Sequence, residues 1–302
     1  MEIFNRIMVA LDHTYFDREV LRFANYIKKL VNPQMMYFVH IDRNLEMPDY
    51  LNFENAGTQT TVATPKDELL KKSITKEVKK FFGNWNDRVM KVEIAEGRPL
   101  NELLHWSRVK KIDLILVGNK KISDGSGITG NKLAREAGCS VMFVPENANL
   151  PLKNIIIPFD FSGNADYALK AALSMKKEIS DSNLTALHVF DVPLFNNYEI
   201  NINYRELVKN VLVFKEKSFN EYLEKEGLNK ESINPVFLEN ASGRTAKYIN
   251  DYLLKEAADL AVVGAKGHSA WDSFLMGSVT EKLLSLNNTN PILVVRRCQE
   301  LM

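Results

Sequence analysis

Cysteine is scarce in this chain of 302 residues, and so is any excess of one charge. Cys139 and Cys298 are its two cysteines, which argues against a disulfide framework or a thiolate zinc site. The 39 basic and 38 acidic side chains leave a formal net charge of +1. The chain as a whole therefore has no electrostatic excess for binding nucleic acid, and the basic cluster at residues 76–80 is interpreted as a solvated helix face.

Long apolar runs and catalytic signatures are missing as well. No stretch is long enough to span a bilayer, and no basic-then-apolar leader stands at Met1. We expect no membrane partner and a cytoplasmic location. The Walker phosphate loop, the serine nucleophile elbow and paired catalytic carboxylates do not occur either. We therefore predict no catalytic residue and no set of metal ligands.

The chain does contain an internal repeat, with an offset of roughly half its length. Residues 9–12 (VALD) match 157–160 (IPFD), and residues 113–118 (DLILVG) match 259–264 (DLAVVG). His40 falls over His188. The matches keep their order, so we predict a duplication into domains at residues 1–147 and 148–302, joined through a polar segment near 145–151.

Each half alternates short apolar segments with amphipathic ones. Such alternation predicts parallel strands joined by right-handed helical crossovers. The expected fold is α/β, with two tandem doubly wound domains that each have a five-stranded parallel sheet and helices on both faces. The predicted strands lie near residues 6–11, 35–41, 89–95, 113–118, 140–144, 154–159, 184–190, 233–238, 259–264 and 291–296. The predicted helices lie near residues 16–30, 66–83, 99–110, 130–137, 164–177, 204–226, 244–257 and 277–286.

One glycine pattern stands between a predicted strand and a predicted helix of the second half. Gly264, Gly267 and Gly277-Ser278 form G-x2-G-x9-G-S directly after the apolar run 259–263. A loop in that position lies at the carboxyl edge of a parallel sheet, where open α/β folds bind ligands, and a helix start favours anions. The pattern predicts a phosphate-binding loop, or else only a tight turn followed by an ordinary helix start.

Together these features resemble the universal stress protein family. Each half looks like one of its domains, and the glycine pattern is similar to the nucleotide-binding signature of the family's ATP-binding branch. The resemblance rests on Asp160 after the first strand, His188-Val189 at the end of the second, and the loop that begins at Val263. It implies that the second domain holds ATP or a related adenine nucleotide, with Mg²⁺ bridging the phosphates as a further candidate.

The resemblance also implies the residues of the site. Pro158, Phe159 and Asp160 would border the adenosine, and Val189 would meet the adenine. The loop from Val263, with Gly264, Lys266 and Gly267, would wrap ribose and phosphates, while Gly277, Ser278, Val279 and Thr280 would offer donors to the phosphates.

Residue chemistry leaves several alternatives open. An ionised Asp160 suits ribose hydroxyls and repels phosphate. Ser278 and Thr280 can donate to phosphate oxygens, or Ser278 can cap its own helix. Lys266 either neutralises phosphate or is solvated. We expect a surface role for His268, and packed core positions for His40 and His188.

The first half departs from the glycine pattern. Lys121 stands where the second glycine is expected, and Asn131 replaces the serine. A side chain there hinders close backbone approach, so we predict weak or no nucleotide binding by the first domain. The G-x-G-x-x-G at residues 125–130 does not directly follow a strand and is interpreted as a flexible loop.

Three functions therefore stay open. The leading hypothesis is a regulatory stress protein that binds an adenine nucleotide in its second domain, with the first domain as structural partner. The alternatives are a slow nucleotide hydrolase and an interaction scaffold without a ligand. The resemblance further suggests that the last strands, 141–144 and 292–295, pair to form an intramolecular pseudo-dimer, with a further homodimer left open.

Overall fold

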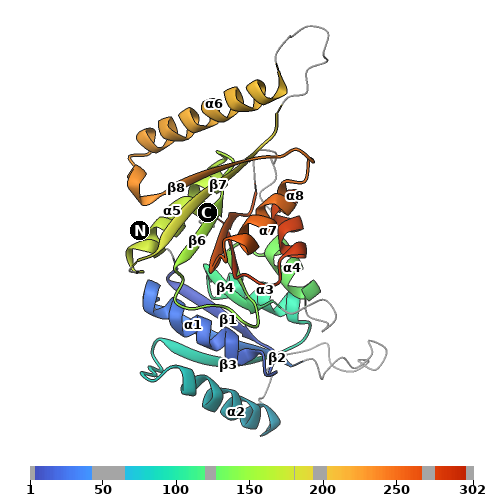
Figure 1. Cartoon of the computed structure of the whole chain (residues 1–302). Coiled ribbons are helices and arrows are strands. Elements are labelled where there is room, and N and C mark those ends of the chain that lie inside the picture. The colour runs from blue at the N-terminus through green and yellow to red at the C-terminus, as the bar shows by residue number, and fades with distance from the viewer. Residues whose placement is uncertain are drawn as a thin grey trace, which may run out of the picture. The chain divides into compact units, whose positions relative to one another are not determined.

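The computed structural model describes residues 4–42, 65–119, 127–179, 181–192, 203–266 and 276–296. It divides into two units, of which one ends at Ala148 and the other begins at Asn149. In both units short strands alternate with helices (Figure 1). Within the described ranges, every helix is too short or too polar to cross a membrane.

The first unit contains five parallel strands and four helices among its described residues. The strand order is β3-β2-β1-β4-β5. The elements are β1 (Arg6–Leu11), α1 (Asp17–Val31), β2 (Met35–Asp42), α2 (Pro65–Phe81), β3 (Met90–Glu96), α3 (Pro99–Val109), β4 (Leu114–Gly118), α4 (Gly127–Glu136) and β5 (Ser140–Val144).

The second unit repeats this order of elements. Its strands are arranged β8-β7-β6-β9-β10, and its recorded strand pairs are parallel. The elements are β6 (Asn154–Pro158), α5 (Gly163–Lys177), β7 (Asn183–Phe190), α6 (Tyr204–Lys225), the 3-10 turn η3 (Lys230–Ser232), β8 (Asn234–Glu239), α7 (Thr245–Lys255), β9 (Leu260–Gly264), α8 (Ser278–Leu286) and β10 (Ile292–Val295).

The predicted α/β fold is confirmed, and the predicted helices and strands are found with ends that differ by at most three residues. The largest difference is α4, which begins at Gly127. The central strands are apolar and buried throughout, as β9 shows, because helices cover both faces of a parallel sheet. In the first unit α1 contacts α2 and α3 contacts α4, whereas α7 contacts α8 in the second. This pairing follows from right-handed crossovers that leave the sheet in opposite directions.

A carboxylate fixes the start of the first strand in each unit. Asp113, just before β4, accepts hydrogen bonds from the backbone N–H groups of Asn5 (2.9 Å) and Arg6 (3.0 Å). Asp259, just before β9, accepts from Lys153 and Asn154, each at 2.9 Å. The aspartates that open the matching segments DLILVG and DLAVVG therefore join two strands that are distant in the sequence.

A buried histidine fixes the turn that follows the first strand of each unit. The Nδ1 atom of His40 lies 3.0 Å from the Leu11 carbonyl, and that of His188 lies 2.7 Å from the Phe159 carbonyl. Since a carbonyl can only accept, Nδ1 carries the hydrogen in both. Burial lowers the pKa of both rings, which favours the neutral form. The predicted core positions of these two histidines are confirmed.

The first unit also buries a carboxylate below this turn. Asp17, at the start of α1, is 9% exposed and accepts from the N–H groups of Asp12 (3.1 Å) and His13 (2.8 Å). Burial, with the neighbouring Asp12 charge adding to it, raises the pKa of Asp17 to about 7 despite the two donors. The carboxyl group thus binds a proton in the folded chain at a pH where the unfolded chain has lost it.

Linkage predicts how this group changes stability with pH. The stabilising contribution is complete below the ordinary pKa of 3.8 and is lost as the pH rises through about 7. Asp17→Asn removes this titration. We expect the unfolding free energy of the wild type, relative to the variant, to fall between pH 4 and pH 7 in urea titrations. A difference that stays constant over this range would contradict the assignment.

Candidate functional site

A pocket of about 290 Å³ lies in the second unit, where β6, β7 and β9 end. The parallel pairing of β6 with β7 and with β9 brings these three ends to one edge of the sheet. The pocket thus occupies the carboxyl edge, where the strand order reverses and open α/β folds bind ligands. Its walls come from these strand ends and from α5, α7 and α8.

Most of the predicted site residues meet around this pocket. β6 and its turn contribute Pro158, Phe159 and Asp160; β7 contributes Val189; β9 and its loop contribute Val263, Gly264 and Lys266; and the start of α8 contributes Gly277, Ser278, Val279 and Thr280. Gly267 and His268, like Lys121 in the first unit, lie outside the described residues.

Gly264 allows β9 to lie directly against the start of α5. A Cβ atom at this position would be 2.8 Å from the backbone carbon of Asn164 and 2.9 Å from its carbonyl oxygen. Such distances are far below a normal contact, so any side chain would force the two elements apart. The sequence pattern suggested that this glycine serves a close approach to a ligand, whereas here the close approach is to the protein's own helix.

The start of α8 presents free backbone donors to the pocket. Gly277 is the N-cap residue and has no side chain that could cap the helix. Its own N–H donates to the Ala265 carbonyl at 2.8 Å. No described residue accepts the N–H groups of Ser278 and Val279, which are the first two residues of the helix. Such unpaired donors at a helix start attract anions. Gly277 rather than Ser278 occupies the cap, so self-capping by Ser278 is not observed.

Thr280 uses its hydroxyl group inside the protein. Its side chain is 7% exposed, and its Oγ1 donates to the Gly264 carbonyl at 2.9 Å. The Thr280 hydroxyl, which the sequence made a candidate donor to phosphate, therefore already donates its hydrogen to the Gly264 carbonyl. This bond ties the start of α8 to the end of β9, so Thr280 shapes the anion-facing wall of the pocket.

Lys266 places a buried cation at the same wall. Its Nζ atom is inaccessible to solvent, and within the described ranges it has no hydrogen-bond partner. An ammonium group removed from water without a counter-charge is costly. The pocket that Lys266 lines is therefore suited to an anion, which would restore the missing interaction.

Asp160 stands on another side, in the turn between β6 and α5. Its Oδ1 accepts the Ser162 N–H at 3.0 Å, and Ser162 caps α5 through the Ala165 N–H at 3.2 Å. Phe161, between them, has a positive φ of 64°. The turn holds the Asp160 carboxylate at the pocket's exposed rim, so the site combines one negative wall with one wall of donors.

Several pocket residues escaped sequence analysis, namely Ala165, Leu187, Thr245, Ile249 and Leu283. The apolar period of the helices marks Ile249 and Leu283 as core, and such a pattern does not separate a core residue from a pocket wall. The sequence analysis assigned no role to the start of α7. Thr245 at that start is held by Asn240, whose Nδ2 donates to the Thr245 Oγ1 at 3.1 Å.

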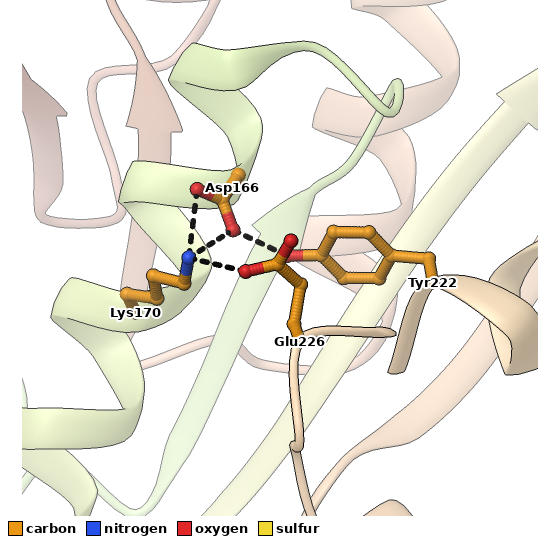
Figure 2. A network of polar contacts seen from close by, with 4 residues as sticks. All are labelled: Asp166, Lys170, Tyr222 and Glu226. Atoms are coloured by element: carbon orange, nitrogen blue, oxygen red, sulfur yellow. Dashed lines mark hydrogen bonds and ion pairs between the residues drawn. The ribbon is translucent and has the colours of Figure 1, made fainter. Parts of the chain in front are cut away.

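A polar network holds α6 against α5 (Figure 2). The Lys170 Nζ lies 2.9 Å from the Asp166 Oδ1 and 2.7 Å from the Glu226 Oε2, and the Tyr222 hydroxyl donates to Asp166 at 2.6 Å. The pKa of Lys170 is raised by its bonds to the two carboxylates. The Tyr222 ring packs on Phe159 at 4.9 Å between centroids, so the network supports a residue of the pocket wall.

The first unit fills the equivalent place differently. A Cβ atom on Gly118, at the end of β4, would be 2.7 Å from the ring of Phe16, which stands where the second unit has Asn164. The next residue is the buried Asp17, where the second unit has the pocket residue Ala165. An aromatic ring and a buried acid thus replace an amide and a methyl group.

A family model and a curated relative both relate this chain to universal stress proteins. The sequence model of the universal stress protein family matches residues 151–296. A universal stress protein from Methanocaldococcus jannaschii is 30% identical over 145 residues, which is 48% of this chain and 82% of that protein.

Solved structures show the same fold over nearly the full chain. A universal stress protein from Archaeoglobus fulgidus has a TM-score of 0.62 at 16% identity, covering 97% of this chain and 96% of its own. A functionally unknown protein from Pseudomonas aeruginosa reaches 0.66 at 11% identity, covering 98% and 94%. At these identities the likeness concerns the fold alone.

The contact at Gly264 can be tested by adding one methyl group. Gly264→Ala should lower the unfolding free energy by about 1–3 kcal/mol, because backbone atoms of Asn164 must shift. Chemical denaturation measures the effect. Gly163→Ala, at the start of α5, is the matched control, since a Cβ atom there meets nothing within 4 Å and stability should hold. Equal stabilities for the two variants would refute the steric explanation.

Proposed function

Because the chain belongs to the universal stress protein family, we propose that its second unit binds an adenine nucleotide in the pocket at the carboxyl edge of its sheet. The observation that carries the proposal is the Lys266 ammonium, which has no hydrogen-bond partner among the described residues, beside the open start of α8. A buried cation and free helix N–H groups at one wall are complementary to phosphate.

The other end of the pocket suits a nucleoside. Asp160 accepts hydrogen bonds when ionised, which matches ribose hydroxyls and keeps phosphate away. Val189, Leu187 and Ile249 supply apolar surface of the kind a purine ring packs against. We place the phosphates along Lys266 and α8, and the adenosine between Asp160 and α7.

Mg²⁺ would be a companion of the phosphates in this proposal. Among the described residues, no group of three or more His, Cys, Asp or Glu side chains could hold a metal. Asp160 is the acidic residue of the pocket wall. The ion would therefore enter on the phosphate oxygens, whose charge it would partly neutralise, rather than occupy a site built by the protein.

The first unit is proposed as a structural partner without its own nucleotide. The Phe16 ring covers Gly118, and the buried Asp17 side chain occupies the position that the pocket residue Ala165 has in the second unit. The proposal thus predicts one nucleotide bound per chain, in the second unit.

Equilibrium titration of the full chain with labelled ATP tests this proposal. Saturable binding with one site per chain is expected. Lys266→Gln should weaken ATP binding about tenfold or more, as for the loss of a hydrogen bond to a charged group, and should leave adenosine binding unchanged. Gly277→Val combined with Ser278→Asp should abolish ATP binding by crowding and by like charge.

A surface lysine provides the matched control. Lys255→Gln removes the same charge from the end of α7, where Lys255 is 77% exposed and pairs with Glu256. It should bind ATP like the wild type. No saturable binding by the wild type, or undiminished binding by the Gly277→Val, Ser278→Asp double variant, would sink the proposal and favour a scaffold without a ligand.

Hydrolysis is a separate question that product analysis answers. We expect bound ATP to stay intact over many dissociation times, because the described pocket wall has Asp160 as its carboxylate and lacks a second one to pair with it. Chromatography of the nucleotide after incubation measures this. Steady release of ADP that disappears in Asp160→Ala would instead identify a slow hydrolase.

A further inference from the structure

The loop between β8 and α7 carries a buried side chain with every polar group occupied. Asn240 is 9% exposed, and its Nδ2 donates to the Asp191 Oδ1 at 2.8 Å and to the Thr245 Oγ1 at 3.1 Å. Its Oδ1 accepts the Arg244 N–H at 2.9 Å. The Asp191 carboxylate can only accept and the Arg244 N–H can only donate, so these two partners identify the Nδ2 and Oδ1 atoms of Asn240. The Nδ2 donor must therefore face Thr245.

This arrangement determines where the Thr245 hydroxyl can donate. Its oxygen accepts from Asn240, so its hydrogen must point elsewhere. No residue in the described part of the chain accepts that hydrogen. Thr245 lines the pocket together with Ile249, one turn further along α7. The hydroxyl is thus a positioned donor at a pocket wall.

The first unit lacks this device among its described residues. The strand registers match Phe190 with Glu239 and Asp42 with Glu96, so both loops start at the same place in the fold. From there the first unit reaches its helix through Gly97 and Arg98, and the first helical residue is Pro99. The second unit inserts a longer loop, with Asn240 at its beginning, and puts Thr245 at the helix start. The donor therefore occurs in the unit that has the pocket.

Thr245 lies near the carboxyl end of β7, because Asn240 links it to Asp191, the residue that follows this strand. The strand order is β7-β6-β9, with Val189 on β7 and Lys266 beyond β9. The helix α7 that carries Thr245 contacts both β7 and α8. A neutral donor among apolar side chains at this end suits a ring nitrogen, which is the acceptor of a purine.

We propose that Thr245 is a specificity-determining residue, which donates its hydroxyl hydrogen to an unprotonated ring nitrogen of the purine, and that Asn240 is the positioning residue that aims it. This proposal rests on the proposed nucleotide site. A site built to donate at this point rejects a ring that lacks the acceptor, because the hydroxyl group is then left without a partner.

Binding of ATP and of three analogues, in which N1, N3 or N7 is replaced by carbon, tests the role of Thr245. Thr245→Val keeps the shape and should weaken ATP binding about fivefold to tenfold, as for one neutral hydrogen bond. The wild type should bind one of the analogues as weakly as Thr245→Val binds ATP. Thr245→Val should bind that analogue with the same affinity as the wild type does. The other two analogues retain the accepting nitrogen, so Thr245→Val should weaken their binding by the same factor as it weakens ATP binding.

Three further variants separate this role from folding. Thr245→Ser retains the hydroxyl and should keep ATP affinity and analogue selectivity. Asn240→Ala should reduce the selectivity between analogues while Thr245 itself is retained. If Thr245→Val lowers the unfolding midpoint, Thr245→Pro replaces it, since Pro99 occupies the matched helix start in the first unit.

The outcomes distinguish the two proposals. Undiminished ATP binding by Thr245→Val, or an equal loss for ATP and all three analogues, would overturn the role of Thr245. If Lys266→Gln still weakens ATP binding in that case, the nucleotide site itself stands. If the wild type binds no adenine nucleotide, both proposals fall together.

Discussion

The contact between the end of β9 and the start of α5 is the constraint on which the site depends. Because Gly264 has no side chain, β9 can approach Asn164 to a distance that any Cβ atom would prevent. The Gly264 carbonyl then accepts the Thr280 hydroxyl, which fixes the start of α8. The absence of a side chain at Gly264 thus allows a turn with a carboxylate and a helix start with free donors to line one pocket.

The two units show how the same topology supports different chemistry. Both fix their first strand with an aspartate and their first turn with a buried histidine. At the strand edge they diverge, because Phe16 and Asp17 stand where the second unit has Asn164 and Ala165. The strands and helices are set by apolar burial, which tolerates such changes, while the edge residues are free to vary.

Support for the pocket comes from groups that never touch it. The network of Asp166, Lys170, Tyr222 and Glu226 is partly exposed, so its ion pairs contribute modestly to stability. Its structural effect is to fix Tyr222 through Asp166 (Figure 2), which holds the Tyr222 ring against Phe159. In the same way Asn240, buried and fully bonded, orients Thr245 from behind. The positions of the pocket residues Phe159 and Thr245 are therefore determined by side chains from α6 and from the loop before α7.

The sequence by itself determined the order and the approximate bounds of the helices and strands, because apolar periodicity and glycine placement act locally. It also located the strand ends and the start of α8 that line the pocket, since parallel strands present their carboxyl ends at one edge. Tertiary structure decided what each side chain does there. Whether Lys266 is buried without a partner, whether the Thr280 hydroxyl is free, and that Thr245 reaches the pocket all depend on groups distant in the chain. Burial and hydrogen bonding arise between elements, and a linear pattern does not record which elements meet.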